Sequence, residues 1–423
     1  MSKRLSRREL LKKAALGAAA AGIGFPAIVP ARALGAEEKA PASERLGLGF
    51  IGVGGMGSGH LGGLMWRKEI EIRAVCDVYE PHRLAAKERV GGDCAAYNDF
   101  RDLLDRKDID AVVIATPDHW HVLVSITACQ AGKDIYCEKP LTLTIEEGRA
   151  LVNAVRRYGR VFQTGSQQRS EDNFRFACEL VRSGRIGKLH TIRTGFGGAP
   201  TSGYQPDTDP PPGLDWNLWL GPAPWVRYNE LRCLYNFRWF YDYSGGKMTD
   251  WGAHHNDIAQ WGNGTELSGP VEIEGTATFP TSGLYDTATG FLITYTYANG
   301  LKLICGDGHG AKFEGTDGWV HVDRGFLEAS PPELLQEKLG PGDVHLYKSV
   351  GGHHQNWLDC IKTREKPICD VEIGHRSVSV CHLGNIAIRT GRTLRWDPEN
   401  ERFLGDDAMN RWLSKPMRAP WHL

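Results

Sequence analysis

A glycine-rich turn at residues 52–57, Gly-Val-Gly-Gly-Met-Gly, constrains the fold of this chain more than any other feature. It follows a short apolar run at 46–53 and precedes a helix-like stretch that reaches about residue 68. In this GxGxxG pattern, the first glycine allows a tight turn, the second lets the backbone approach a pyrophosphate, and the third lets helix and strand pack closely. The free N–H groups at the start of the helix would face the phosphates. The pattern therefore predicts a dinucleotide site that includes Gly52, Gly54, Gly55, Met56 and Gly57.

An acidic residue after the next apolar run indicates which dinucleotide fits. Asp77 lies 25 residues after Gly52, near the end of the predicted strand 70–78. Its carboxylate can accept hydrogen bonds from both hydroxyls of an adenosine ribose, and it would repel a 2′-phosphate. Arg83 nearby is an argument for NADP, because an arginine can accommodate a 2′-phosphate. We expect NAD rather than NADP; a glycine-rich turn in some other α/β protein is the alternative.

The alternation of strands and helices defines the fold class. Strand-like runs at 111–116, 134–137 and 161–164 alternate with helical segments at 97–105, 122–131 and 145–158, which predicts a parallel sheet covered by helices. After residue 168 the strand-like runs follow one another, at 271–280, 290–297, 301–305 and 319–322, and helices return at 354–362 and 372–389. We therefore predict an α/β protein with a Rossmann domain at 46–168. A substrate-binding and oligomerisation α/β domain at 169–423 would follow, with a large, mostly antiparallel open sheet and C-terminal helices.

The first 36 residues have a different composition. The segment Ser6-Arg7-Arg8-Glu9-Leu10-Leu11-Lys12 looks like a twin-arginine export motif, and an Ala- and Gly-rich apolar run follows at 14–29. That run is too short to span a hydrocarbon core of roughly 30 Å as a good helix. We predict a signal peptide at 1–36, a linker at 37–45, and a periplasmic protein with no membrane attachment after cleavage.

Charge and cysteine content exclude several classes of protein. The 423 residues carry 50 basic and 51 acidic side chains, a net charge of −1, which gives no attraction to nucleic acid. The 10 cysteines include no CxxC pair, so a zinc or iron–sulfur site is not indicated. We expect most of them to be small buried hydrophobic residues.

Two further motifs carry charged groups suited to catalysis. Glu138-Lys139-Pro140 follows a predicted strand, at the sheet edge where α/β proteins bind ligands, and a lysine there can stabilise an alkoxide. Asp250 and His254 are four residues apart, so on one helix a carboxylate would lie beside an imidazole and raise its basicity. A His/Asp zinc site, drawing on the histidine pairs at 119–121 and 353–354, is the competing interpretation, but no third ligand has typical spacing. We predict no metal.

Taken together, these motifs resemble a known family. The glycine turn, Thr116-Pro117 with His121 following, Glu138-Lys139-Pro140, and Asp250-x-x-x-His254 are similar in order and spacing to the Gfo/Idh/MocA family of glucose–fructose oxidoreductases and inositol dehydrogenases. The resemblance implies three catalytic residues, Lys139, Asp250 and His254, with His254 as the proton acceptor from a sugar hydroxyl. It implies that the cofactor is lined by Thr116, Pro117, His121, Glu138 and Lys139, and we assign Gln167 to the cofactor as well.

The Trp-rich stretch at 199–246 is less typical of simple inositol dehydrogenases and looks more like exported relatives of unassigned activity. We therefore do not carry over the best-known substrates of the family. Our candidates for contact with a sugar or glycoside are Arg169, Arg238, Trp239, Tyr241, His255 and Asp257. The alternative is that the aromatic residues among them only pack.

The predicted compartment limits the reaction. The periplasm offers no soluble NAD, so we expect tightly bound NAD that is restored in each cycle. Sugar–sugar hydride transfer, epimerisation, and transient oxidation followed by glycoside cleavage all satisfy this condition. Of these reactions we favour transient oxidation followed by glycoside cleavage, as in the NAD-dependent α-N-acetylgalactosaminidases that the family resembles. Tyr241, His255 or a residue of the 167–169 loop would be the second acid or base. A plain sugar dehydrogenase and a non-catalytic sugar-binding protein are the alternatives.

We also expect a homo-oligomer, a dimer or tetramer. Helices in the second domain are enough to cover one face of its sheet, and an uncovered apolar face would be buried against another copy.

Overall fold

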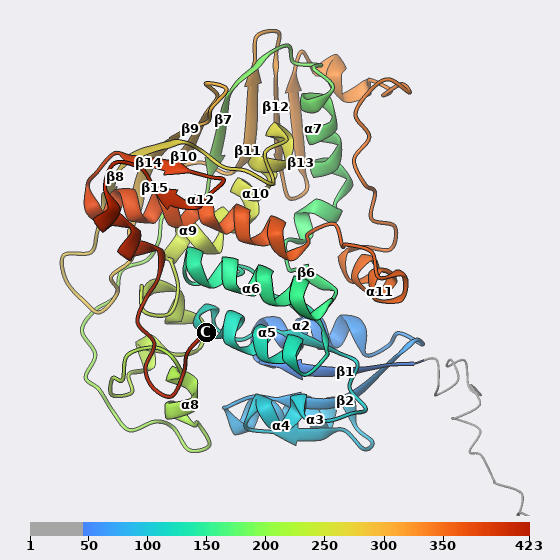
Figure 1. The fold of residues 1–423 in the computed structure, drawn as a ribbon, viewed down its shortest axis with the longest axis vertical. Coiled ribbons are helices and arrows are strands. Elements are labelled where there is room, and N and C mark those ends of the chain that lie inside the picture. The colour runs from blue at the N-terminus through green and yellow to red at the C-terminus, as the bar shows by residue number, and fades with distance from the viewer. Residues whose placement is uncertain (1–44) are drawn as a thin grey trace, which may run out of the picture. The chain divides into compact units, whose positions relative to one another are not determined.

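The computed structural model describes residues 45–423; the predicted signal peptide and nearly all of the predicted linker lie outside the described residues. The first sheet has six strands in the order β3-β2-β1-β4-β5-β6; β1, β2 and β6 are labelled in Figure 1. The pairs β2/β3, β1/β4, β4/β5 and β5/β6 are parallel. Its strands are β1 (Leu46–Ile51), β2 (Ile70–Cys76), β3 (Ala95–Tyr97), β4 (Ala111–Ile114), β5 (Asp134–Cys137) and β6 (Phe162–Thr164).

Five helices accompany this sheet: α2 (Gly55–Leu64), α3 (Glu80–Val90), α4 (Phe100–Leu104), α5 (His121–Gln130) and α6 (Ile145–Tyr158). Helix α6 begins where it does because Thr144 and Glu147 form a capping box, and it ends at Gly159 with a left-handed backbone. The helix that we expected at 97–105 is shorter, because Asp99 caps α4 with its side chain. Helix α3 was not predicted.

The second sheet has nine strands in the order β13-β12-β11-β7-β10-β9-β8-β14-β15. Only β7 and β10 pair in parallel among the registers of this sheet, and the other pairs are antiparallel. The prediction of an α/β fold with a Rossmann sheet and a mostly antiparallel second sheet is confirmed. The strands are β7 (Leu189–Gly195), β8 (Glu272–Thr278), β9 (Gly290–Thr296), β10 (Lys302–Gly306), β11 (Gly310–Gly315), β12 (Trp319–Asp323), β13 (Phe326–Ser330), β14 (Leu394–Asp397) and β15 (Arg402–Phe403).

Three helices pack on one face of the second sheet: α7 (Asp172–Arg182), α10 (Gly252–Asn263) and α12 (Val371–Thr390). The shared core includes Ile258, Tyr295 and Phe313, all fully buried. The remaining helices of this half are α8 (Trp216–Leu220), α9 (Gly246–Asp250) and α11 (His353–Thr363). Short 3₁₀ helices lie at Asp118–Trp120, Gln167–Ser170, Glu230–Arg232, Leu234–Trp239, Pro332–Gln336 and Asp407–Leu413.

The opposite face of the second sheet is not apolar, which corrects our reason for expecting an oligomer. Side chains that alternate with the core residues are mostly polar there. Exposed examples are Arg193, Glu274, Thr276 and Lys302, with Leu292 as an apolar exception. A polar face needs no second copy to cover it, so the homo-oligomer stays a prediction without that support.

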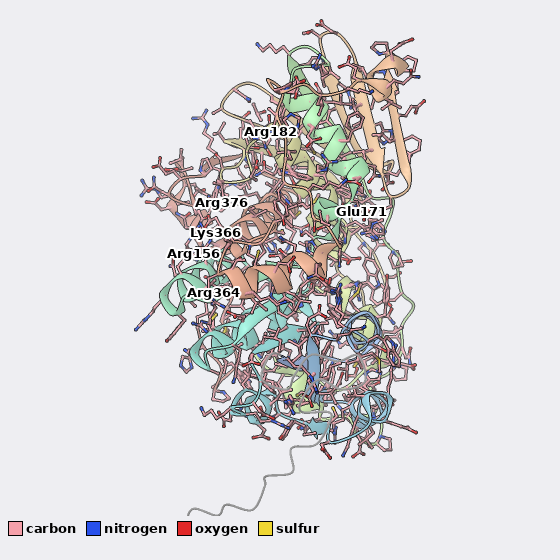
Figure 2. The ribbon with its side chains drawn as sticks, turned by 90° about the vertical axis from the view of Figure 1, so that its right-hand side faces the viewer. Arg156, Glu171, Arg182, Arg364, Lys366 and Arg376 are labelled. Carbon is pink, nitrogen blue, oxygen red and sulfur yellow. The ribbon has the colours of Figure 1, made fainter. Side chains whose placement is uncertain are left out.

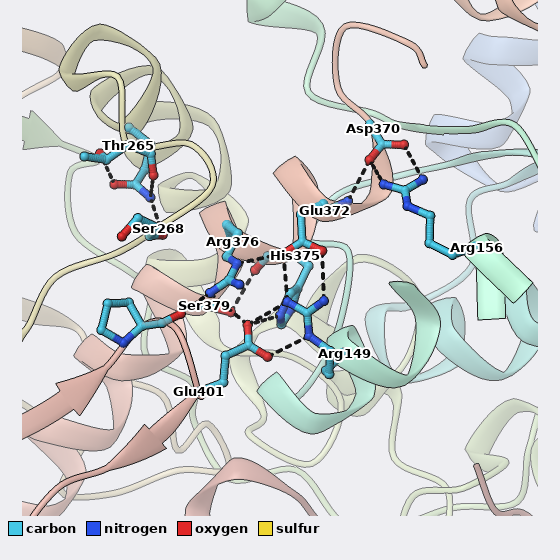
Figure 3. Close-up of polar contacts among 12 residues, drawn as sticks. Arg149, Arg156, Thr265, Ser268, Asp370, Glu372, His375, Arg376, Ser379 and Glu401 are labelled. Atoms are coloured by element: carbon cyan, nitrogen blue, oxygen red, sulfur yellow. Dashed lines mark hydrogen bonds and ion pairs between the residues drawn. The ribbon is translucent and has the colours of Figure 1, made fainter. Parts of the chain in front are cut away.

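An ion-pair network joins the Rossmann half to the second half. Helices α6 and α12 lie side by side (Figure 1). The guanidinium of Arg149 on α6 donates to Glu372 at 2.7 and 2.8 Å and to Glu401 at 2.8 and 3.0 Å (Figure 3). Arg156, which is labelled in Figure 2, pairs with Asp370 at the start of α12. These contacts hold the two helices in one register.

The cysteines and the hydropathy of the helices can be compared with expectation over residues 45–423. All ten cysteines are buried and unpaired, as predicted. Between residues 45 and 423, no helix combines the length and apolar character that a membrane span requires.

Candidate active site

The glycine turn brings strand and helix unusually close. Gly52 has a φ of 80°, and a Cβ there would lie 2.7 Å from the backbone of Ala115. A Cβ on Gly57 would lie 1.9 Å from the carbonyl oxygen of Gly52. Both positions therefore require glycine, the first for its backbone angle and the second for close packing.

The start of α2 is suited to a bound pyrophosphate. Its N-cap, Gly54, offers no side-chain cap, and the first turn holds no acidic residue. A Cβ on Gly55 would meet nothing within 4 Å, so the backbone borders open space, and Met56 is half exposed. Just after β4, the hydroxyl of Thr116 is buried and has no hydrogen-bond partner in the part of the chain that the structure describes. Uncapped N–H groups and an unpartnered hydroxyl are the features that a dinucleotide would satisfy.

Asp77 lies directly after β2, as a ribose-binding carboxylate should. Its oxygens accept hydrogen bonds from the backbone N–H groups of Val53 and Tyr79, each at 2.9 Å. A hydrogen bond to Asp77 raises the pKa of His82. Arg83 donates to the Asp77 carbonyl and to Asn98, each at 3.3 Å, so its guanidinium is already engaged. This arrangement favours NAD over NADP.

Glu138 forms part of a buried chain of polar contacts at the end of β5. Its Oε1 lies 2.9 Å from His60 Nε2 and accepts a hydrogen bond from Gln167 Nε2 at 3.0 Å. His60 Nδ1 lies 2.9 Å from His354 Nε2. Burial alone would raise the pKa of Glu138, but the hydrogen bond from His60 helps to lower it. His60 lies on α2 one turn after Gly57, and no motif in the sequence predicted it as a site residue.

His121 links two loops of the site rather than facing open space. Its Nδ1 lies 2.6 Å from the carbonyl oxygen of Pro140, and its Nε2 lies 2.9 Å from that of Thr116. Pro117 caps the 3₁₀ helix Asp118–Trp120 between these positions. The predicted cofactor residues 116, 117 and 121 thus support the loop that carries Lys139.

Lys139 and Asp250 form an ion pair at the centre of the candidate site. The Nζ of Lys139 donates to Asp250 Oδ1 at 2.7 Å and to the Asp250 carbonyl at 3.1 Å. Arg238 Nε donates to the same carboxylate at 3.4 Å. Burial alone would raise the pKa of Asp250, but the charges of Lys139 and Arg238 outweigh it and lower the pKa below its usual value.

His254 is near this pair in sequence but is not oriented by Asp250, which corrects our expectation. Helix α9 ends at Asp250 and α10 begins after Trp251, so the two residues are not on one continuous helix. The carboxylate of Asp250 bonds to Lys139 instead, and His254 Nδ1 is buried without a hydrogen-bond partner among the described residues. Burial, and then the positive charges of Lys139 and Arg324, lower the pKa of His254 well below its usual value.

Arg169 and Asp257 pair with each other, so neither is free for a substrate. Arg169 donates to Asp257 through Nε at 2.7 Å and through Nη2 at 2.8 Å. Ser377 donates to the same carboxylate, and the guanidinium lies 5.0 Å from the ring centre of Trp261. Both charged side chains are about 1% exposed. Spacing alone did not show that the two side chains satisfy each other, so their contact with a substrate stays a prediction without support from this geometry.

Three other substrate candidates are also largely interior. His255 stacks on Phe196 with ring centres 6.0 Å apart, and it is 1% exposed. Trp239 belongs to a buried aromatic cluster formed largely by the Trp-rich stretch, which favours the alternative that this residue only packs. Tyr241 accepts a hydrogen bond from the Ala288 N–H at 3.4 Å, and burial raises its pKa to about 12. Arg238 is the predicted substrate residue that reaches the Lys139–Asp250 pair.

The histidines of the zinc alternative have other contacts. His119 Nε2 lies 3.0 Å from the carbonyl oxygen of Trp219, and His353 lies between Ser170 and the Thr164 carbonyl. Within residues 45–423, no group of three or more His, Cys, Asp or Glu side chains is arranged to hold a metal ion.

Comparison with known proteins places these features in a family context. Residues 46–166 match the Gfo/Idh/MocA description "Oxidoreductase family, NAD-binding Rossmann fold", and residues 201–423 match "Oxidoreductase family, C-terminal alpha/beta domain". The myo-inositol 2-dehydrogenase of Thermotoga maritima is 24% identical over 84% of this chain and 97% of its own length.

Two further relatives differ in what they share with the chain. A glycosyl hydrolase family 109 protein of Shewanella pealeana is 31% identical, over 44% of each chain, so the match spans less than half of that relative. The structure of an aldose–aldose oxidoreductase from Caulobacter crescentus has a TM-score of 0.63 at 19% identity, over 83% of this chain and 99% of the other. This last likeness concerns the fold.

Proposed function

Because the chain belongs to the Gfo/Idh/MocA oxidoreductase family, we propose that it oxidises a ring hydroxyl of a sugar or glycoside with tightly held NAD. The residues that would hold the cofactor are those of the glycine turn, Asp77 and Thr116. NAD, when bound, supplies a hydride acceptor that a later step of the same cycle regenerates.

The observation that carries the proposal is the Lys139–Asp250 ion pair, together with the buried imidazole of His254, whose pKa burial and the charge of Lys139 lower. Asp250 keeps Lys139 positioned, and the ammonium stabilises the negative charge that develops on the substrate oxygen. His254 accepts the hydroxyl proton, because its lowered pKa keeps the imidazole unprotonated near neutral pH. Arg238, which reaches the same carboxylate, would contact a polar substituent of the sugar.

We further propose that the oxidation serves glycoside cleavage. A ketone at C3 acidifies the neighbouring C2–H, and loss of that proton allows the glycosidic substituent at C1 to leave. The partial similarity to a glycosyl hydrolase family 109 protein supports this form of the reaction. The contacts of Arg169 and Tyr241 remove both from the candidates for the second acid or base. Because the glutamine amides of the 167–169 loop do not titrate, His255 is the candidate that remains.

The twin-arginine motif at residues 6–12 supports a periplasmic location. Proteins on that route are exported already folded, so the cofactor would be bound in the cytoplasm and carried across. Protein folded in the cytoplasm and then purified should contain NAD at most sites. An empty preparation that exchanges NAD rapidly would contradict this part of the proposal.

A simple dehydrogenase of a sugar or cyclitol is the second candidate. The match to an inositol dehydrogenase over nearly its whole length favours it. Purified protein would be given a panel of aryl glycosides in deuterated water without added NAD. Release of the aryl group with deuterium at C2 would support cleavage; oxidation only with added NAD, and no aryl release, would support the dehydrogenase.

A further inference from the structure

A cavity of about 320 Å³ is lined by none of the cofactor residues described above, although Tyr241 is part of its wall. It is lined by the N-terminal end of α6, the segment before α9, the C-terminal half of α12 and the C-terminal segment 411–415. None of Lys139, Asp250 and His254 lines it. Its volume is at the lower end of the range of roughly 300–1,000 Å³ that is typical of small-molecule sites.

Three cationic side chains line this cavity and no carboxylate does: Arg389, Arg411 and Lys415. Of the carboxylates outside the lining whose charges act on Lys415, Asp242 acts most strongly, and Asp286 and Glu147 are engaged with backbone groups. Asp286 accepts a hydrogen bond from the Tyr241 N–H at 2.8 Å, and Glu147 accepts from Leu143 and Thr144 in the capping box of α6. The lining therefore carries positive charge that no carboxylate of the lining balances.

Lys415 is the most buried of the three cations. Its ammonium donates to the carbonyl oxygen of Tyr241, and no carboxylate of the described chain lies within ion-pair distance. Burial lowers the pKa of Lys415, although more distant carboxylates such as Asp242 partly oppose that effect. A partly buried ammonium without a counter-ion carries a desolvation cost, and an anion in the cavity would reduce that cost.

Arg389 also lacks a carboxylate partner. Its guanidinium lies 4.0 Å from the ring centre of Tyr241 and 4.8 Å from that of Trp412, so two aromatic faces hold it in place. Among residues 45–423 it has neither a hydrogen bond nor an ion pair, in contrast to Arg149 and Arg156 on the adjacent helix α6, which both pair with carboxylates (Figure 3). Its planar donors are free to bind the two oxygens of an oxyanion.

We propose that this cavity is a second ligand site, which binds a carboxylate or phosphate group carried by a molecule about the size of a monosaccharide. Lys415 and Arg389 bind the oxyanion, and Arg411 contributes charge at the entrance. The cavity borders Ser244 and Gly245, and Gly245 is the N-cap of α9, whose last residue is Asp250. The site is thus one short helix away from the catalytic pair, without sharing its residues.

Isothermal titration of the purified, NAD-loaded protein tests this proposal. The probes are gluconate and glucose 6-phosphate, with glucose as the neutral control. We expect at least one anion to bind and glucose not to bind at this site. Lys415→Met and Arg389→Met should each weaken anion binding at least tenfold, whereas Lys415→Arg should retain it.

Two control variants separate this site from general charge effects and from the catalytic pair. Lys362→Met removes one exposed positive charge from the last turn of α11, and it should leave anion binding unchanged. Lys139→Met should also leave it unchanged. No binding of either anion, equal weakening by Lys362→Met, or loss in Lys139→Met would each overturn the proposal. The test requires no turnover, so it does not depend on the proposed function.

Discussion

The Nζ of Lys139 lies 2.7 Å from Oδ1 of Asp250, although 111 positions separate the two residues in the sequence. Lys139 follows the fifth strand of the Rossmann sheet, whereas Asp250 ends a short helix of the second half. The ion pair therefore joins the cofactor-binding half of the chain to the half that is expected to hold the substrate. We expect the pair to contribute to catalysis through its charges and not through its hydrogen bond alone.

Asp250→Asn tests this claim, because it keeps the shape of the side chain and removes its charge. Lys139 would lose its counter-ion and its position, so we expect kcat to fall by roughly 10²–10³-fold. Bound NAD should stay at the wild-type level. Activity and NAD content of the same preparation provide the measurement, and wild-type kcat in this variant would contradict the role of the pair.

The pH dependence of turnover tests the state of His254. A general base must be unprotonated, and burial with nearby positive charge lowers the pKa of this imidazole. Activity should therefore persist as the pH falls through about 6.5, the ordinary histidine pKa, and decline only at more acidic pH. The profile of kcat/KM in the free enzyme measures this. If kcat/KM instead falls with a midpoint of about 6.5, and this fall is absent in His254→Ala, the pKa of the imidazole is not lowered.

Asp77→Ala should weaken NAD binding without unfolding the protein. The carboxylate is the group expected to hold the ribose hydroxyls, and such charge-assisted hydrogen bonds contribute on the order of 1.5–3 kcal/mol each. That loss corresponds to at least a tenfold rise in the NAD dissociation constant. Asp93→Ala, at an exposed turn, is the matched control. NADP in place of NAD in the wild-type preparation would show that Asp77 has been misinterpreted.

Arg149→Met should destabilise the protein by on the order of 1–3 kcal/mol, because it removes the hydrogen bonds from this guanidinium to Glu372 and Glu401. Arg157→Met is the control, because Arg157 is an exposed neighbour on α6 that forms no ion pair with any residue from 45 to 423. The midpoint of thermal unfolding would report the difference. Equal midpoints for the two variants would show that the network in Figure 3 adds no stability.

The same network makes stability depend on pH. Burial alone would raise the pKa of Glu372, but hydrogen bonds from Arg149 and Arg376 lower it to about 2. An unfolded glutamate titrates near 4.3, so this contribution is complete above about that pH and is lost as the pH falls toward the folded value. The difference in unfolding midpoint between wild type and Arg149→Met should shrink over that acidic range.

The sequence predicted those parts of the site that depend on local geometry. A glycine turn between strand and helix, and an acidic residue after the next strand, have consequences within one supersecondary unit. The α/β class followed from the alternation of strands and helices in the same way. These features require no knowledge of distant contacts.

Contacts between distant segments were not predictable from spacing. The pairing of Arg169 with Asp257 depends on how α10 packs against the loop after β6, and both residues had been assigned to a substrate. The break at Trp251 separates Asp250 from His254, which a four-residue spacing could not show. The contact between His60 and Glu138 joins residues 78 positions apart.

The most direct test of the account follows reduction of the bound nicotinamide. NAD-loaded wild type and His254→Ala, matched for NAD content, would be mixed with an accepted glycoside under single-turnover conditions, and the near-ultraviolet absorbance of reduced nicotinamide recorded. We predict a rise and decay in the wild type, and a rise at least 10²-fold slower in His254→Ala, as loss of a positioned base typically causes. The same rise in both proteins, or none in a wild type that cleaves the glycoside, would contradict oxidation by Lys139, Asp250 and His254.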